Sequence, residues 1–228
     1  MATLEARGVS KRYAVRGIET WALRDVTLAI ETGEFTALAG PSGSGKTTLL
    51  NLFGALDAPS SGAIAIDGED LAELSRSELA ALRLAKLGFV FQAFNLIPVL
   101  SARENVEFVM ELQGVATAER RARALAMLAE VGLAELADKR PLEMSGGQQQ
   151  RVAIARAIVS EPRVVLADEP TANLDSVTAA NLIELMERLN RERGVTFLFS
   201  THDPRVIERA RRVVRLRDGG VVADERDA

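Results

Sequence analysis

The stretch of sequence that decides the fold is Gly40-Pro41-Ser42-Gly43-Ser44-Gly45-Lys46-Thr47-Thr48. An apolar run at 35–39 precedes it and an apolar helical pattern follows it, which predicts a strand, a tight turn and a helix in that order. Glycine has no Cβ, so the glycines at 40, 43 and 45 let the main chain curl with its N–H groups around a phosphate chain. The stretch matches the P-loop pattern and predicts a P-loop α/β fold.

Two side chains of this turn have predicted roles of their own. Lys46 can reach the β- and γ-phosphates of a nucleotide, and the Thr47 hydroxyl can occupy one position around a magnesium ion. The helix that starts near Lys46 adds the positive end of its dipole. An accidental glycine turn is the alternative, and the strand and helix on either side argue against it.

Composition limits the classes of function. The chain has 228 residues, 47% of them apolar, which is enough for a substantial core and argues against disorder. A net charge of −4 does not favour non-specific binding of nucleic acid, which depends on basic side chains. There is no cysteine, so disulfides and cysteine-ligated metals are excluded. We expect a soluble protein, since no apolar run approaches the roughly 20 residues of a membrane span and the first residues do not resemble a signal peptide.

A second candidate anion site is Ser145-Gly146-Gly147-Gln148. Ser145 can cap a helix predicted from about 148 to 160, and the two glycines expose the first N–H groups of that helix. A plain helix cap is the alternative. One nucleotide rarely needs two such sites on one chain, so the pair points toward a second molecule.

Two carboxylates follow an apolar run at 164–167. The run predicts a strand buried on both faces of a parallel sheet, and ligands bind at the carboxyl ends of such strands. Asp168 is placed to hold magnesium, directly or through water, and Glu169 can act as the general base that polarises the attacking water. The alternative is a charged strand end that simply meets solvent.

Three further features have open interpretations. Tyr13, the only tyrosine, can belong to the core or stack on adenine, and His202, the only histidine, is either structural or a hydrogen-bond partner of a γ-phosphate. Asn95 and Pro98 prevent regular structure at 93–100, so this apolar segment either packs inward or faces another protein. The arginines of 205–218 are interpreted as a solvated strand face, with lipid headgroups as the alternative.

Together these motifs resemble the nucleotide-binding subunit of ATP-binding cassette (ABC) transporters over nearly the whole chain. The matching motifs, in the order of the family, are the P-loop at 40–48, Gln92 as the Q-loop, Ser145-Gly146-Gly147-Gln148 as the signature, Asp168-Glu169, Asn173-Leu174-Asp175 as the D-loop, and His202 as the switch. Two positions depart from the pattern. Met144 replaces the usual leucine of the signature, which should cost little, and Thr171-Ala172-Asn173 replaces the usual serine and alanine at the start of the D-loop.

The resemblance implies one domain over 1–228. A parallel core sheet and an N-terminal antiparallel β subdomain are expected over about 1–92 and 162–228, and a helical signature lobe over about 93–161. The implied ligands are ATP, stacked on Tyr13 and held by residues 40–48, and Mg²⁺, held by Thr47, Gln92 and Asp168. Lys46, Gln92, Glu169 and His202 are the implied catalytic residues. Two copies are expected to pair head to tail, each completing the other's site with its signature turn.

A narrower resemblance concerns Tyr13-Ala14-Val15-Arg16-Gly17, Gly33-Glu34-Phe35-Thr36-Ala37, the segment 49–57 and Phe94-Asn95-Leu96-Ile97-Pro98. These look like the lipoprotein-release and macrolide-export group, which includes the cell-division cassette. It implies an integral membrane permease that docks near Gln92 to Leu100, a cytoplasmic position at the inner face of the membrane, and no nucleic acid. The alternatives are a cassette that clamps nucleic acid in DNA repair, chromosome organisation or translation, and a regulatory cassette that hardly hydrolyses ATP.

Overall fold

Two sheets form the frame of the molecule. The computed structural model describes residues 2–15 and 18–226, so Arg16 and Gly17 of the narrower resemblance lie outside the described residues. The antiparallel sheet has the order β2 (Ile18–Glu31), β1 (Ala2–Val15), β4 (Ser61–Ile66), β5 (Glu69–Asp70). The second sheet has the order β10 (Gly220–Arg226), β9 (Arg212–Arg217), β3 (Phe35–Ala39), β8 (Thr196–Thr201), β7 (Val164–Asp168), β6 (Leu87–Val90). It is parallel except at β10.

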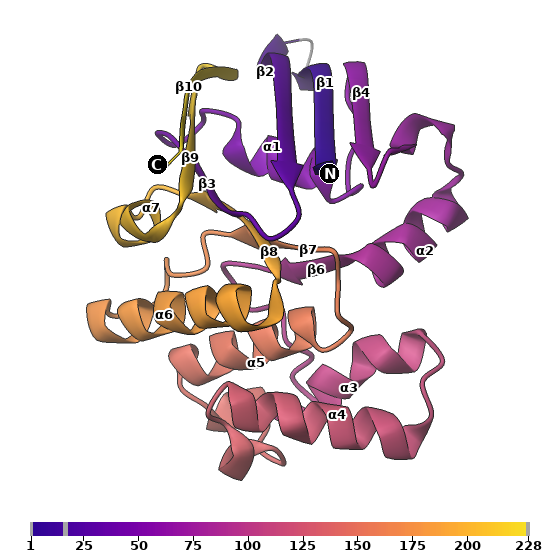
Figure 1. Cartoon of the computed structure of the whole chain (residues 1–228), viewed down its shortest axis with the longest axis vertical. Coiled ribbons are helices and arrows are strands. Elements are labelled where there is room, and N and C mark those ends of the chain that lie inside the picture. Colours follow the sequence, from indigo (N-terminus) through magenta and orange to yellow (C-terminus); the bar gives the residue numbers. More distant parts are fainter. Residues whose placement is uncertain (1, 16–17, 227–228) are drawn as a thin grey trace.

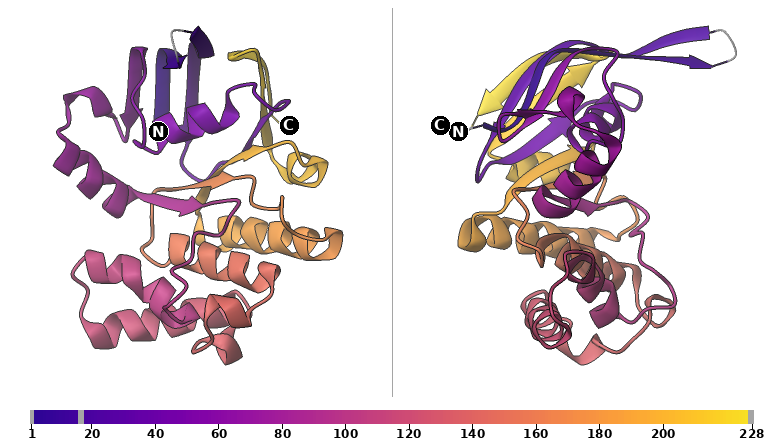
Figure 2. Two further views of the ribbon diagram at one scale, coloured as in Figure 1. Left: turned by 180° about the vertical axis from the view of Figure 1, so that it is seen from behind. Right: turned by 90° about the vertical axis from the view of Figure 1, so that its right-hand side faces the viewer.

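Helices cover the second sheet on both faces. They are α1 (Lys46–Phe53), α2 (Arg76–Lys86), α3 (Ala102–Leu112), α4 (Thr117–Glu130), α5 (Gly146–Ile158), α6 (Ser176–Arg193) and α7 (Pro204–Arg209). Figures 1 and 2 show the antiparallel sheet and α1 at one end of the molecule, and α3 to α6 at the other. None of the helices in the described ranges has the length and apolar character that crossing a bilayer requires.

The parallel strands separate two apolar cores. Val165, Phe197 and Phe199 pack with the helices α3 to α6, whereas Leu166 and Leu198 pack with α1 and the antiparallel sheet. This alternation follows from the two-residue period of a strand whose faces are both covered. The sheet therefore places α1 and α5 on opposite faces (Figure 1).

Local signals set the ends of several helices. Ser75 caps α2 with a capping box to Glu78, and Ser101 does the same for α3 with Glu104. Gly194 ends α6 in a left-handed conformation with φ 66°. Ser145 caps α5 as predicted, although the helix starts at Gly146 and not near 148.

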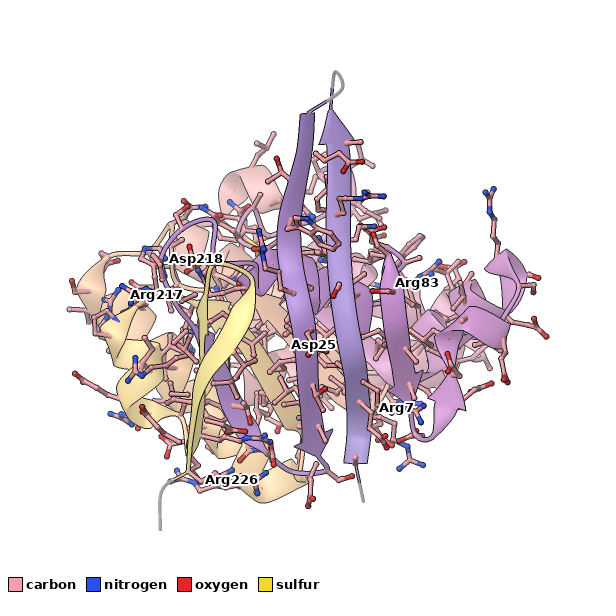
Figure 3. All side chains as sticks on the ribbon, turned by 90° about the horizontal axis from the view of Figure 1, so that it is seen from above. Arg7, Asp25, Arg83, Arg217, Asp218 and Arg226 are labelled. Carbon is pink, nitrogen blue, oxygen red and sulfur yellow. The ribbon has the colours of Figure 1, made fainter. Side chains whose placement is uncertain are left out.

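The arginines of 205–218 differ from expectation in part. Arg212 is 6% exposed because β9 lies beside β3 inside the sheet. Its guanidinium pairs with Glu34 and Asp224, each at 2.8 Å, and donates to the Ala29 carbonyl. Arg226 of β10, labelled in Figure 3, adds a contact to Glu34 at 3.4 Å. The interpretation as a solvated strand face holds for Arg215 and Arg217. It is wrong for Arg212, which is buried, and for Arg205 and Arg209, which belong to the helix α7 and not to a strand.

The segment 93–100 is irregular, as predicted. Phe94 and Asn95 both have positive φ, and their carbonyls accept hydrogen bonds from Arg156 at 3.0 and 2.6 Å. Asn105, fully buried, donates to the Ile97 and Leu100 carbonyls and accepts from the Ile97 N–H. Leu96 packs against the core, in agreement with inward packing, while Val99 is 70% exposed, so contact of this segment with another protein stays a prediction.

Candidate functional site

The glycine-rich turn connects β3 to α1. Its three glycines have φ of 157°, 79° and 102°. A Cβ at Gly40 would lie 2.3 Å from the Leu216 carbonyl oxygen, and one at Gly45 would lie 2.5 Å from that of Ala22. Glycine is therefore required at 40 and 45 by neighbouring backbone as well as by the curl of the turn.

The interior of this turn is prepared for an anion. Lys46 is 6% exposed, and its Nζ donates to the carbonyls of Gly40 and Pro41 at 2.8 and 3.0 Å. The Ser44 hydroxyl is buried without a hydrogen-bond partner among the described residues. Among those same residues, no side chain caps the N-terminus of α1. The backbone N–H groups at the start of α1, the Lys46 ammonium group and the positive end of the helix dipole together fit a phosphate group.

Thr47 and Asp168 meet at the carboxyl edge of the sheet. Thr47 Oγ1 lies 3.0 Å from Asp168 Oδ1. Magnesium prefers oxygen ligands and usually takes only one or two carboxylates beside substrate phosphates. Residues 2–15 and 18–226 hold no cluster of three or more His, Asp or Glu that could bind a metal. The donor set fits Mg²⁺ bound together with a nucleotide. Gln92 is exposed, and its backbone carbonyl accepts from Asn173 Nδ2 at 2.9 Å.

Glu169 and His202 are direct neighbours, which the sequence did not predict. Glu169 Oε1 lies 2.7 Å from His202 Nδ1, and the N–H of Glu169 donates to the Ser200 carbonyl at 2.8 Å. Glu169 has φ 45°, a costly conformation for a residue with a side chain. Such strain occurs often at functional sites, where the surrounding structure holds it in place.

Tyr13 is not a core residue. It lies on β1, its side chain is 39% exposed, and its hydroxyl donates to Asp57 Oδ2 at 2.8 Å. The pKa of the Tyr13 phenol lies above its ordinary value. Burial is the main cause and Asp57 adds to it, while a hydrogen bond with the Thr48 hydroxyl acts in the opposite direction. An exposed aromatic ring whose hydroxyl is next to α1 can receive a nucleotide base.

The turn at Ser145 lies apart from the P-loop helix. Ser145 Oγ accepts from the Gln148 N–H at 3.3 Å, and Gln148 Oε1 accepts from the Ser145 N–H at 2.8 Å. A Cβ at Gly147 would lie 2.3 Å from Thr178 Cγ2, so close packing with α6 also requires this glycine. Since α5 and α1 cover opposite faces of the sheet, one chain does not bring the two turns together around one ligand (Figure 1).

The motifs described above agree with a family profile. The profile described as ABC transporter matches residues 23–172. The chain belongs to the ABC transporter family. This ABC cassette is 48% identical over 221 residues to the macrolide export ATP-binding/permease protein MacB of Syntrophobacter fumaroxidans, an alignment that covers 96% of the cassette and 31% of that protein. It is 47% identical to the lipoprotein-releasing system ATP-binding protein LolD of Anaeromyxobacter dehalogenans, covering 97% and 93%.

Solved structures confirm the fold class of the ABC cassette. The dimeric post-hydrolysis structure of the ATP-binding cassette MJ0796, bound to ADP and Pi, matches with a TM-score of 0.90 and 43% identity over 98% of each chain. The protein cbiO1 from Clostridium perfringens matches with a TM-score of 0.88 and 32% identity, over 99% of the cassette and 88% of that chain. The cassette spans about a third of the MacB relatives and nearly all of LolD.

Several supporting residues of the cassette were missed by sequence reasoning. Thr171 Oγ1 donates to Asp203 Oδ2 at 2.7 Å, and Arg205 Nη2 pairs with the same oxygen. These contacts join the turn after β7, which holds Glu169, to the turn after β8, which holds His202. An aspartate before Pro204 is a typical helix cap, a signal that finds the cap of α7 but not its contact with Thr171.

Proposed function

We propose that this chain binds MgATP and hydrolyses it, and that two copies closing on two ATP molecules drive a separate membrane protein. One observation carries the proposal: Lys46, the Thr47 and Asp168 pair, and the Glu169 and His202 pair all lie at the carboxyl ends of neighbouring strands. This edge is where open α/β sheets bind ligands.

Each residue has a task that its surroundings support. Lys46 and the N–H groups of the P-loop would bind the β- and γ-phosphates. Thr47 and Asp168 would hold Mg²⁺, which when bound neutralises developing charge on the phosphate oxygens. Glu169 Oε2 would take the proton of the attacking water. The hydrogen bond that Glu169 Oε1 accepts from His202 Nδ1 keeps that carboxylate oriented. Gln92 stays a predicted further ligand.

The pairing of two copies explains the second anion site. The Ser145 turn presents a capped helix N-terminus away from its own P-loop, so a second copy facing it head to tail would use both turns for one nucleotide. A dimeric structure of the similar cassette MJ0796 supports this arrangement.

The membrane partner is inferred from relatives and from segment 93–100. The relatives named above are an export permease and a lipoprotein-releasing system, and in the former the cassette is about a third of the whole protein. Segment 93–100 keeps Val99 exposed and is part of the surface on which a permease would dock. The chain would thus work at the inner face of the membrane through its partner.

The substitution Glu169→Gln tests the central claim. Because the amide cannot accept the proton, we expect kcat for ATP hydrolysis to fall about 10²- to 10⁴-fold while ATP still binds. Steady-state phosphate release and equilibrium binding of ATP measure the two quantities. Glu192→Gln, at an exposed position of α6, is the control and should keep the parent rate. Hydrolysis by Glu169→Gln at the parent rate would show that another group is the base.

A further inference from the structure

The ring of Tyr13 is held by two charged residues that have no part in the function proposed above. Its hydroxyl donates to Asp57 Oδ2 at 2.8 Å, and Lys11 Nζ lies 4.9 Å from the ring centroid. Lys11 Nζ also donates to Asp57 Oδ1 at 2.6 Å and to the Ala58 carbonyl at 2.7 Å. The Lys11 side chain is only 11% exposed. Both carboxylate oxygens of Asp57 are thus engaged, one by the lysine and one by the phenol.

The charges of this group support a fixed hydrogen-bond direction. Desolvation acts to raise the pKa of Asp57, but the hydrogen bonds from Lys11 and Tyr13 outweigh it and lower that pKa. Burial and Asp57 raise the pKa of Tyr13. At neutral pH the phenol therefore stays a donor and the carboxylate a charged acceptor, the stronger kind of hydrogen bond.

The turn that holds Asp57 is continuous with the P-loop helix. Residue 57 follows α1, which is about 12 Å long and has the phosphate-binding turn at its other end. The Leu56 N–H donates to the Asn51 carbonyl at 3.0 Å, and Arg83 Nη1 donates to the Ala55 carbonyl at 2.8 Å. One rigid helix thereby connects the support of the Tyr13 ring to the turn that binds phosphate.

We propose that Lys11 and Asp57 are positioning residues that hold the Tyr13 ring as a platform for the nucleotide base, at a set distance from the P-loop. This inference rests on the proposed binding of ATP, together with stacking of its base on Tyr13, which the family resemblance implies. Lys11 lies over one face of the ring, where its cation interacts with the π-system, so the base takes the other face. The hydrogen bond to Asp57 stops rotation of the phenol away from α1. A platform ordered before binding strengthens affinity because less freedom is lost on binding.

The test compares Tyr13→Phe, Asp57→Ala and the double variant. Loss of one hydrogen bond corresponds to about a 3- to 10-fold rise in KM for ATP, with kcat within about 2-fold of the parent. The double variant should show no larger rise than the stronger single one, because both changes break the same contact. Binding of inorganic tripolyphosphate, which has no base, should be unchanged in all three, as measured by calorimetry.

Asp70→Ala is the matched control. Asp70 belongs to the antiparallel sheet that contains Tyr13. Its side-chain exposure is 28%, against 33% for Asp57, and both carboxylates accept a backbone N–H. We expect Asp70→Ala to have the same KM for ATP as the parent protein. Tyr13→Ala removes the aromatic ring itself, so it tests base stacking separately from the positioning of the ring by Lys11 and Asp57.

The outcomes that would overturn the inference are distinct. If Tyr13→Ala raises KM while Tyr13→Phe and Asp57→Ala do not, base stacking stands and the positioning role is wrong. The positioning role is also wrong if the two single effects multiply in the double variant, or if tripolyphosphate binding weakens in parallel with ATP binding. If Tyr13→Ala leaves KM unchanged, the base site of the proposed function itself is wrong.

Discussion

Gly147 combines two requirements at one position. It belongs to the predicted signature turn, and it also lies where α5 packs tightly on α6, with space too small for a Cβ beside Thr178. Thr178 cannot easily move, since it is β-branched and its hydroxyl donates to Asp175 Oδ2 at 2.5 Å. A change at Gly147 therefore affects stability separately from any effect on ligand binding.

We expect Gly147→Ala to lower the free energy of unfolding. Overpacking of this kind costs about 1–3 kcal/mol, more than the gain of about 1 kcal/mol from placing alanine in a helix. Thr178→Ser removes the obstructing methyl group and keeps the hydroxyl, so the double variant should be as stable as Thr178→Ser alone or more so. Urea unfolding measures all three. Parent stability in Gly147→Ala would show that the helices separate at little cost.

At the scale of elements, the hairpin of β9 and β10 is attached through Arg212. This guanidinium lowers the pKa of Asp224, while partial burial acts in the opposite direction. A carboxyl group whose pKa is lower in the folded than in the unfolded state stabilises the fold at pH values above its unfolded-state pKa. This stabilisation is lost as the pH falls through its folded-state pKa.

Asp224→Asn should therefore lower the melting temperature at pH 7. The difference from the parent should begin to shrink as the pH falls below about 4, the ordinary pKa of an aspartate in the unfolded chain, and should disappear only when Asp224 is also protonated in the folded protein. Thermal unfolding between pH 7 and pH 3 measures this. Asp218→Asn, in the exposed turn between the same strands (Figure 3), is the control, because it removes a carboxylate from the same hairpin and leaves the contacts of Arg212 in place. A difference for Asp224→Asn that is independent of pH would contradict the assignment.

For the whole molecule, the two faces of the central sheet predict shared sites between copies. A chain with Lys46→Ala lacks the lysine that we propose binds phosphate, and in a chain with Ser145→Arg a large side chain blocks the proposed signature turn. Each should be nearly inactive alone. A mixture should recover ATP hydrolysis, because a mixed pair contains one site in which both the lysine and the serine are intact. Phosphate release by the mixture, compared with each chain at the same total concentration, measures the recovery.

Two results would contradict shared sites. One is full activity of Ser145→Arg alone, and the other is a mixture that is no more active than its components. Arg191→Ala, at an exposed position of α6, provides a partner chain with both turns intact. It should hydrolyse ATP at the parent rate without a second kind of chain.

Local sequence patterns predicted many of the helices, strands and turns. They did not predict contacts between residues that are far apart in the sequence. The bounds of β3 and the start of α1 agree with prediction. Apolar runs, turn glycines and helix caps are signals that a few consecutive residues carry. The contacts of Tyr13 with Asp57 and of Thr171 with Asp203 join residues 44 and 32 positions apart, which no local pattern indicates. Arg212 was misinterpreted because alternation shows that β9 is a strand but not which strands lie beside it.

Segment 93–100 is held in place from behind, by Asn105 and Arg156, through bonds to its backbone carbonyls and one amide. Such bonds do not depend on which side chains the segment itself has. Outward positions such as Val99 can accordingly change during evolution without loss of the loop's shape. If a permease docks on this segment as proposed, a few surface substitutions would adapt the cassette to a new membrane protein without any change in the proposed ATP-binding residues.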